Sequence, residues 1–176
     1  MKSKHAAPLF FAIAAAWFSA PLALAGGSTL AVISAWPPHV SDADEDPTKR
    51  ASRLTEIADA IDGATGDRQE RAALLTLIRY ESGAASHVQR GECKPHECDK
   101  GRATGIYQLH GDVPVELAGQ TSRALGVWRF GFKRCARSHP DPIAGAFQSY
   151  GSGGHCAPSK WSAKRAATMR GLVSRL

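Results

Sequence analysis

Glu81 is the residue of this sequence best suited to acid catalysis, because a long apolar segment ends at it. Residues 71–83 read RAALLTLIRYESG, and apolar side chains cover nearly the whole circumference of the helix that this segment predicts. Such a helix belongs in the middle of a fold, and Glu81 leaves the core at its end. The helix dipole and an apolar surround both disfavour a charged carboxylate there. We therefore expect Glu81 to be a proton donor at neutral pH.

Two further short motifs follow this YESG segment along the chain. They read ATGIYQ at 103–108 and AFQSYGSG at 146–153. In this order and spacing, the three motifs resemble the lysozyme-like domain of soluble lytic transglycosylases and goose-type lysozymes. That family carries Glu-Ser at the end of its central helix, then Ala-x-Gly-Leu-Met-Gln, then Ala-Tyr-Asn-Ala-Gly. The resemblance covers about residues 50–176.

The sequence also departs from the family pattern. It contains no asparagine, so Gly151 stands where the family has Asn after Tyr. Ile106 and Tyr107 likewise replace the Leu-Met pair of the second motif. The proton donor is untouched by these differences.

The resemblance implies a peptidoglycan-cleaving enzyme, a lytic transglycosylase, that acts on the MurNAc-GlcNAc β-1,4 bond without cofactor or metal. Glu81 would be the catalytic acid and base, and Asp99 stands about where goose-type relatives keep an auxiliary Asp. Glu97 and Asp112 are weaker choices for that auxiliary role. The residues expected to bind substrate are Ser82, Gln108 and Tyr150.

Three other functions remain open at this stage. The first is a hydrolytic lysozyme-type muramidase, in which a second carboxylate takes part. The second is a catalytically silent lysozyme-like module that binds glycan strands or a secretion apparatus. The third is a basic exported protein that acts on anionic surfaces. Sequence motifs of serine hydrolases, zinc proteases, P-loop enzymes and dinucleotide-binding enzymes are missing. We expect a monomer whose partner is the glycan strand rather than nucleic acid.

Residues 1–25 are typical of an export signal. Lys2 and Lys4 precede a mostly apolar stretch, and Ala23-Leu24-Ala25 has the small-x-small pattern of a cleavage site. Removal of this segment lowers the formal net charge from +6 to +4, since the segment carries two lysines and no other charged residue. We expect a periplasmic or extracellular protein with no stable membrane span after cleavage.

The four cysteines, Cys93, Cys98, Cys135 and Cys156, all follow that signal. An even number in an oxidising compartment suggests two disulfides, for which three pairings exist. We take the nearest-neighbour scheme, Cys93 with Cys98 and Cys135 with Cys156. A zinc site built on the first pair and His96 is the rival, although its spacing fits no common template.

The remaining pattern predicts a mainly α fold with one irregular or β-hairpin segment after the central helix. Residues 26–49 contain Trp-Pro-Pro and an acidic run, which indicate an N-terminal arm with a solvated tether. Apolar spacing predicts helices around 54–61, after Thr121 or Ser122, after Asp141-Pro142 and from about 159. We expect Trp128 and Trp161 in the core and the basic residues of the last helix mostly outward, Arg165 among them.

Overall fold

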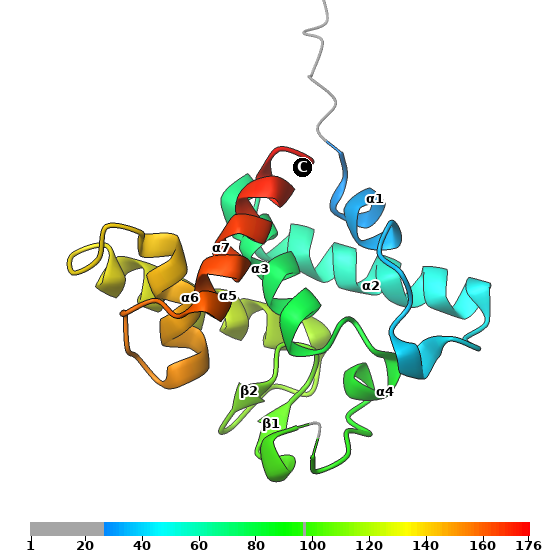
Figure 1. The fold of residues 1–176 in the computed structure, drawn as a ribbon. Coiled ribbons are helices and arrows are strands. Elements are labelled where there is room, and N and C mark those ends of the chain that lie inside the picture. The colour runs from blue at the N-terminus through cyan, green and yellow to red at the C-terminus, as the bar shows by residue number, and fades with distance from the viewer. Residues whose placement is uncertain (1–26, 97) are drawn as a thin grey trace, which may run out of the picture.

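The structure is a computed structural model that describes residues 27–96 and 98–176, so the predicted signal peptide at 1–25 lies outside the described residues. The helices are α1 (Thr29–Ser34), α2 (Pro47–Ala64), α3 (Arg68–Glu81), α4 (Ser86–Gln89), α5 (Leu117–Cys135), α6 (Pro142–Ser152) and α7 (Lys160–Val173). Two 3₁₀ helices, η1 (Val40–Asp42) and η2 (Asp99–Gly101), and two short strands, β1 (Ala103–Thr104) and β2 (Leu109–His110), complete the list. The predicted mainly α fold class is thus confirmed (Figure 1). Within the described ranges, no helix has the length and apolar character that crossing a membrane requires.

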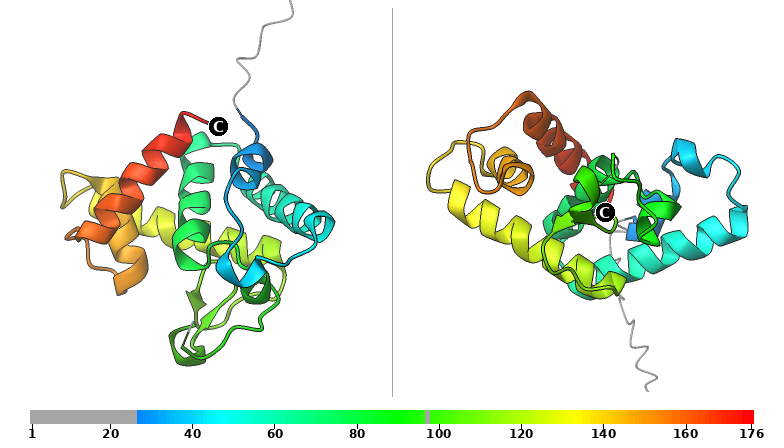
Figure 2. Two further views of the ribbon diagram at one scale, coloured as in Figure 1. Left: turned by 45° about the vertical axis from the view of Figure 1, so that its right-hand side comes forward. Right: turned by 90° about the horizontal axis from the view of Figure 1, so that it is seen from below.

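The α3 helix forms the centre of the molecule. Every residue from Ala72 to Ile78 is buried, and α7, α5 and α2 pack around the helix (Figure 2). The one polar side chain in this run, Thr76, donates its hydroxyl to the Ala72 carbonyl oxygen at 2.7 Å. A satisfied hydroxyl costs little to bury, so the sequence can place a continuous apolar helix at the core.

The helices that have a strong N-terminal capping residue begin where the sequence predicts them. Asp141 caps α6 and accepts a hydrogen bond from the Ala144 N–H at 3.1 Å, with Pro142 at the first helical position. Ser159 caps α7 in a capping box with Ser162. The predicted cap of α5 is wrong: the helix begins four residues before Thr121, which instead bonds back to the Leu117 carbonyl oxygen at 2.8 Å.

The segment predicted as an N-terminal arm is packed into the fold. Val32 and Ile33 on α1 are 3% and 0% exposed, and α1 packs against α2. The tether prediction was also wrong for Asp42, which is 4% exposed. The reason is a contact between residues far apart in the sequence, which local sequence patterns do not show. The Asp42 carboxylate accepts hydrogen bonds from the backbone N–H and the hydroxyl of Ser86, each at 2.8 Å.

The irregular segment after α3 contains the predicted hairpin. The strands β1 and β2 pair antiparallel, with Ala103 opposite His110 and Thr104 opposite Leu109. The Gly105 backbone has φ 69°, and a Cβ atom there would collide with the Gln120 side chain. The turn between the strands therefore favours glycine at this position.

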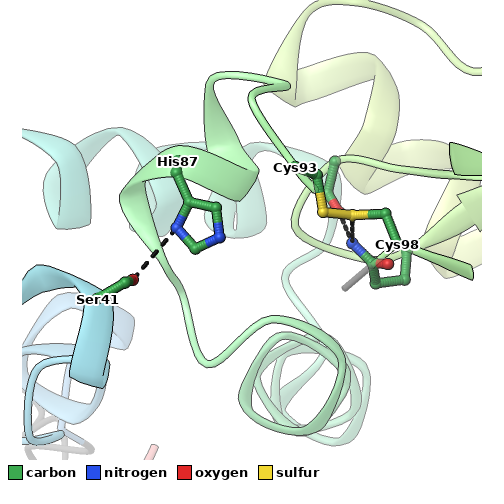
Figure 3. Close-up of a disulfide and its surroundings, with 6 residues drawn as sticks. Ser41, His87, Cys93 and Cys98 are labelled. Atoms are coloured by element: carbon green, nitrogen blue, oxygen red, sulfur yellow. Dashed lines mark hydrogen bonds between the residues drawn. A yellow bond between two sulfur atoms is a disulfide. The ribbon is translucent and has the colours of Figure 1, made fainter. Parts of the chain in front are cut away.

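Two disulfides stabilise the loops on either side of this core, and their pairing agrees with the nearest-neighbour scheme. Cys93 bonds to Cys98 with Cα atoms 6.0 Å apart (Figure 3). Cys135, at the end of α5, bonds to Cys156 after α6, with Cα atoms 5.3 Å apart. Both separations suit a disulfide. Because Cys93 and Cys98 bond to each other, neither offers the thiolate that the zinc alternative needs.

Candidate functional site

Glu81 lies where α3 leaves the core and meets a cleft. The backbone N–H groups of Ser82 and Gly83 both donate to the Ile78 carbonyl oxygen, at 3.1 and 2.9 Å, and end the helix. Gly83 and Ala84 then take left-handed backbone angles, with φ of 60° and 56°, which turn the chain away. The Glu81 side chain is 18% exposed. Its carboxylate is therefore largely shielded from bulk water while it still lines the cleft.

The cleft has a volume of about 550 Å³. The end of α3, the β1–β2 hairpin, one face of α5 and the end of α6 form its walls. Four of the predicted site residues line it, namely Glu81, Asp99, Gln108 and Tyr150. Side chains from three motifs that are far apart in the sequence thus meet at one hollow.

Ser82, predicted to bind substrate, has a different place. It is 8% exposed and is not among the described residues that line the cleft. Its hydroxyl donates to the Ile78 carbonyl oxygen at 3.3 Å and accepts from the Ala84 N–H at 3.2 Å. The hydroxyl is therefore used to hold the end of α3, one residue from Glu81.

Tyr150 joins α6 to the segment between the two strands. Its hydroxyl donates to the backbone carbonyl oxygen of Tyr107 at 2.8 Å. Burial raises the pKa of Tyr150 well above its ordinary value, and the negative charge of Glu81 raises it further. Tyr150 is consequently a neutral hydroxyl at any physiological pH, which keeps this hydrogen bond intact beside Glu81.

Gln108 ends the turn that Gly105 begins. Its backbone is left-handed, with φ of 49°, and its amide group donates to the Gly105 carbonyl oxygen at 3.1 Å. The same amide nitrogen lies 3.2 Å from the sulfur of Cys98. The turn and the disulfide therefore fix the orientation of Gln108 at the wall of the cleft.

Asp99 is the most exposed of the four, with 43% of its side chain accessible. It accepts a hydrogen bond from Arg102 at 2.9 Å and lies 3.5 Å from His110 Nε2. The hydrogen bond from Arg102 lowers the pKa of Asp99, and the neighbouring positive charges lower it further. Asp99 is thus a carboxylate at neutral pH, as an auxiliary group would need to be.

Of the two weaker auxiliary candidates, only Asp112 is described, and it is not among the described residues that line the cleft. Glu97 lies outside the described residues. Asp112 contributes its backbone carbonyl oxygen as an acceptor for Arg123. Asp99 is consequently the carboxylate that the described part of the cleft places together with Glu81.

Arg165 is the site residue that sequence reasoning missed. Its Nη1 group donates to Glu81 Oε1, and its side chain is only 13% exposed. The guanidinium lies against two aromatic rings, 4.4 Å from the Trp161 centroid and 5.2 Å from the Tyr80 centroid. The prediction that Arg165 points outward is therefore wrong.

A signal for Arg165 was present in the sequence. Trp161 and Arg165 are four residues apart, and Thr168 follows three residues later, so all three share one helix face. Thr168 does meet α3, since its hydroxyl lies 2.9 Å from the Tyr80 hydroxyl. Trp161 was predicted in the core, yet it is 38% exposed, and its ring lies against Gly151 at the cleft wall. Trp128, by contrast, is buried as predicted.

The chain just after Glu81 is held by the N-terminal segment. Arg53, which is 8% exposed, donates to the Ala84 carbonyl oxygen and forms ion pairs with Asp42 and Glu45. Burial opposes the charge on Asp42, but hydrogen bonds from Ser86, helped by Arg53, leave the pKa of Asp42 below its ordinary value. This network fixes the turn that directs Glu81 into the cleft.

The chemistry available at the cleft is that of two carboxylates, an amide, a phenol hydroxyl, the His110 imidazole and the Arg123 guanidinium. Within the described residues, no group of three or more His, Cys, Asp or Glu side chains is arranged to hold a metal ion. Comparison with known proteins adds no further assignment, because no family model, curated protein or solved structure matches this chain.

Proposed function

We propose that this protein is a lytic transglycosylase that cleaves the β-1,4 bond between MurNAc and GlcNAc in peptidoglycan. The observation that supports this most is the meeting of Glu81, Gln108 and Tyr150 at one cleft. These residues belong to the three motifs on which the family resemblance rests. A random set of short motifs has no reason to converge in space around a single carboxylate.

In the proposed reaction, one carboxyl group serves two steps. Neutral Glu81 protonates the glycosidic oxygen, and the bond to the MurNAc anomeric carbon breaks as oxocarbenium-like charge develops there. The Glu81 carboxylate then accepts the proton of the MurNAc C6 hydroxyl as that oxygen attacks the same carbon. The products are a 1,6-anhydromuramoyl end and a new GlcNAc hydroxyl, and no water is consumed.

A hydrolytic outcome differs only in the nucleophile. If Asp99 positions a water molecule, the products carry reducing ends and are heavier by one water. The ion pair of Asp99 with Arg102 is compatible with that role but does not aim the carboxylate at Glu81. We favour the anhydro product, because the Glu-Ser pair and the Tyr150 segment resemble transglycosylases more than goose-type lysozymes.

One observation favours a second function, a glycan-binding module that does not cleave. The guanidinium of Arg165 is bound to Glu81, and the proposed first step needs a neutral Glu81. For cleavage to occur, Glu81 must carry its proton on Oε2, the carboxylate oxygen that Arg165 does not bind. A module whose Glu81 stays charged beside Arg165 would bind the strand and leave it intact.

The proposed place of action is the cell envelope, outside the cytoplasm. Disulfides persist in oxidising compartments and are rare in the cytosol, and this chain forms two. The substrate is found in the same compartment in bacteria, which makes the export signal and the proposed activity consistent with each other.

Digestion of purified peptidoglycan tests the proposal. Wild-type protein should clear a wall suspension and release fragments with 1,6-anhydromuramoyl ends, identified by mass spectrometry. Glu81→Gln keeps the side-chain shape and removes the acid, so cleavage should fall by about 100-fold to 10,000-fold. Glu56→Gln, an exposed change on α2, is the matched control and should cleave at the wild-type rate.

Each result separates the candidate functions. Fragments heavier by one water would make the protein a hydrolase. Binding to walls without any release of fragments would favour the silent module. Undiminished cleavage by Glu81→Gln would show that Glu81 is not the catalytic acid.

A further inference from the structure

One face of α5 carries a row of basic and apolar side chains that extends beyond the cleft. The row consists of Arg123, Val127, Phe130, Arg134 and Arg137, spaced four, three, four and three residues apart. This spacing places the first four on one face of α5, and Arg137 follows in the turn just after the helix ends. We call this row the α5 stripe; at a rise of 1.5 Å per residue, its helical part from Arg123 to Arg134 is about 17 Å long.

The α5 stripe is continuous with the cleft. Arg123 and Val127 line the cleft itself, and the other three line a neighbouring hollow of about 330 Å³. The guanidinium of Arg134 lies close to the backbone of Gly154. A Cβ atom added at this glycine would be only 2.9 Å from Arg134 Nη1. Gly154 directly follows Gly153, which lines the cleft, so Arg134 of the second hollow lies next to a turn at the edge of the cleft.

The charges at the far end of the stripe have no acidic partner within the described part of the chain. Arg129, on another face of α5, forms an ion pair with Glu70 at 2.6 Å. Arg123 instead donates to backbone carbonyl oxygens, one of them that of His110 at 3.0 Å. No ion pair between described residues involves Arg134 or Arg137. These two guanidinium groups therefore keep their capacity for an external anion.

The same surface exposes an aromatic ring. Phe130 is 65% exposed and lies between Val127, which is 39% exposed, and the two free guanidinium groups. An apolar patch rimmed by polar residues is typical of a binding site, and Phe130 with Val127 forms a small patch of this kind between the arginines. A flat ring next to cations suits a ligand that carries both apolar faces and carboxylates, as a glycan strand with peptide stems does.

We propose that the α5 stripe binds the carboxylate-bearing peptide stems of the glycan strand beyond the cleaved bond. This inference rests on the proposed function for its substrate, and it adds a second contact to that substrate. Arg134 and Arg137 bind stem carboxylates, and Phe130 packs on the adjoining sugar or stem. An anionic membrane is a poorer fit, because only two apolar side chains interrupt the charges and a membrane-binding helix needs a broad apolar face.

The test measures binding apart from cleavage, in a Glu81→Gln background that leaves the wall intact. Arg134→Gln combined with Arg137→Gln removes two charges from the stripe, and Phe130→Ala removes the ring. Arg68→Gln combined with Arg175→Gln, two exposed arginines elsewhere, removes the same charge and is the matched control. Co-sedimentation is measured with untreated peptidoglycan, with peptidoglycan whose stem carboxylates are converted to amides, and with vesicles of anionic lipid.

We expect each stripe variant to bind untreated peptidoglycan about five- to tenfold more weakly at low salt, as the loss of charge-assisted or stacking contacts predicts. On amidated walls, the Arg134→Gln/Arg137→Gln variant and the protein with an unchanged stripe should bind equally well. Equal weakening by the control pair, or no weakening by the stripe variants, would overturn the inference. Stripe-dependent binding to vesicles and not to walls would also overturn it, in favour of a membrane surface.

The outcome can be separated from that of the proposed function. If the protein with Glu81 restored releases no fragments but stripe-dependent wall binding persists, the proposed cleavage fails and the binding surface stands. If the stripe variants bind and cleave untreated walls like wild type, the surface fails while the cleavage stands.

Discussion

Arg165 on α7 donates a hydrogen bond to the carboxylate of Glu81 on α3, across 84 positions of the sequence. The two side chains are 13% and 18% exposed, and the rings of Tyr80 and Trp161 contact the guanidinium. The orientation of Glu81 therefore depends on the docking of the last helix. This contact both positions the proposed catalytic group and occupies one of its carboxylate oxygens, Oε1.

We expect positioning to be the larger of these two effects. Arg165→Met should lower the free energy of unfolding by about 2 kcal/mol, because it leaves Glu81 partly buried without its partner. Cleavage should fall about tenfold as the carboxylate loses a fixed orientation. Urea unfolding and wall digestion measure the two effects separately.

Arg165→Lys is the matched variant for this test. It restores the positive charge but not the planar fork or its stacking on the rings, so it should recover part of the lost cleavage. If Arg165→Met instead digests walls faster than wild type, the ion pair restrains the catalytic acid and positioning is the lesser effect.

The turn after Glu81 depends on Asp42, and this dependence should vary with pH. Asp42→Asn loses the charge that Arg53 and the Ser86 donors stabilise, at a cost of about 1–3 kcal/mol at pH 7. Because the pKa of Asp42 is lowered in the folded state, its stabilising effect is complete above the ordinary value of 3.8 and is lost as the pH falls through the folded-state value.

The unfolding free energies of wild type and Asp42→Asn should therefore converge below pH 3.8. Urea unfolding at pH 7 and pH 3 measures the difference. Asp44→Asn, an exposed change in the same loop, should match wild type at both values. Equal stability of Asp42→Asn and wild type at pH 7 would show that the network does not hold this segment.

The two disulfides should contribute unequally to stability. The Cys135–Cys156 bond closes a separation of 21 residues and the Cys93–Cys98 bond one of 5. Loop-closure entropy then gives about 3 kcal/mol for the first and about 2 kcal/mol for the second. Close packing around Cys135 supports the same ranking of the two disulfides. A Cβ atom added at Gly145 would lie only 2.7 Å from Cys135 Cβ. Thermal unfolding of the two double-alanine variants compares them, and a lower melting temperature for the 93/98 variant would contradict this ranking.

The parts of this structure that the sequence predicts are those with a local cause. A proline after Asp141 and a serine at 159 define helix starts within one turn of chain. The apolar run before Glu81 predicts a buried helix because burial follows from its own composition. The short separations of the cysteines likewise favour the pairs that form.

The remaining features depend on partners far along the chain. Asp42 is indistinguishable from its exposed acidic neighbours in sequence, and only Ser86, 44 positions away, makes it a buried acceptor. Arg165 shares a helix face with Trp161 and Thr168, but the local sequence does not show that this face docks on α3. The same limit applies at α5, whose first turn has no side-chain cap and therefore no local sign of where it starts.

Asp99→Asn distinguishes a transglycosylase from a hydrolase. Asp99 has φ of 47°, and Asn is among the few residues that adopt this left-handed conformation readily, so the substitution should leave the loop intact. The Asn side chain can still accept the hydrogen bond from Arg102, but it has lost the charge that a water-activating base needs. If Glu81 works alone, Asp99→Asn should keep most of the wild-type rate, within about threefold, since only a surface ion pair is weakened. Its products should still carry 1,6-anhydromuramoyl ends. A loss of 100-fold or more, the usual size of a general-base contribution at about 10² to 10⁴, together with reducing ends in the wild-type digest, would assign the second carboxylate to Asp99 and exclude the single-residue mechanism.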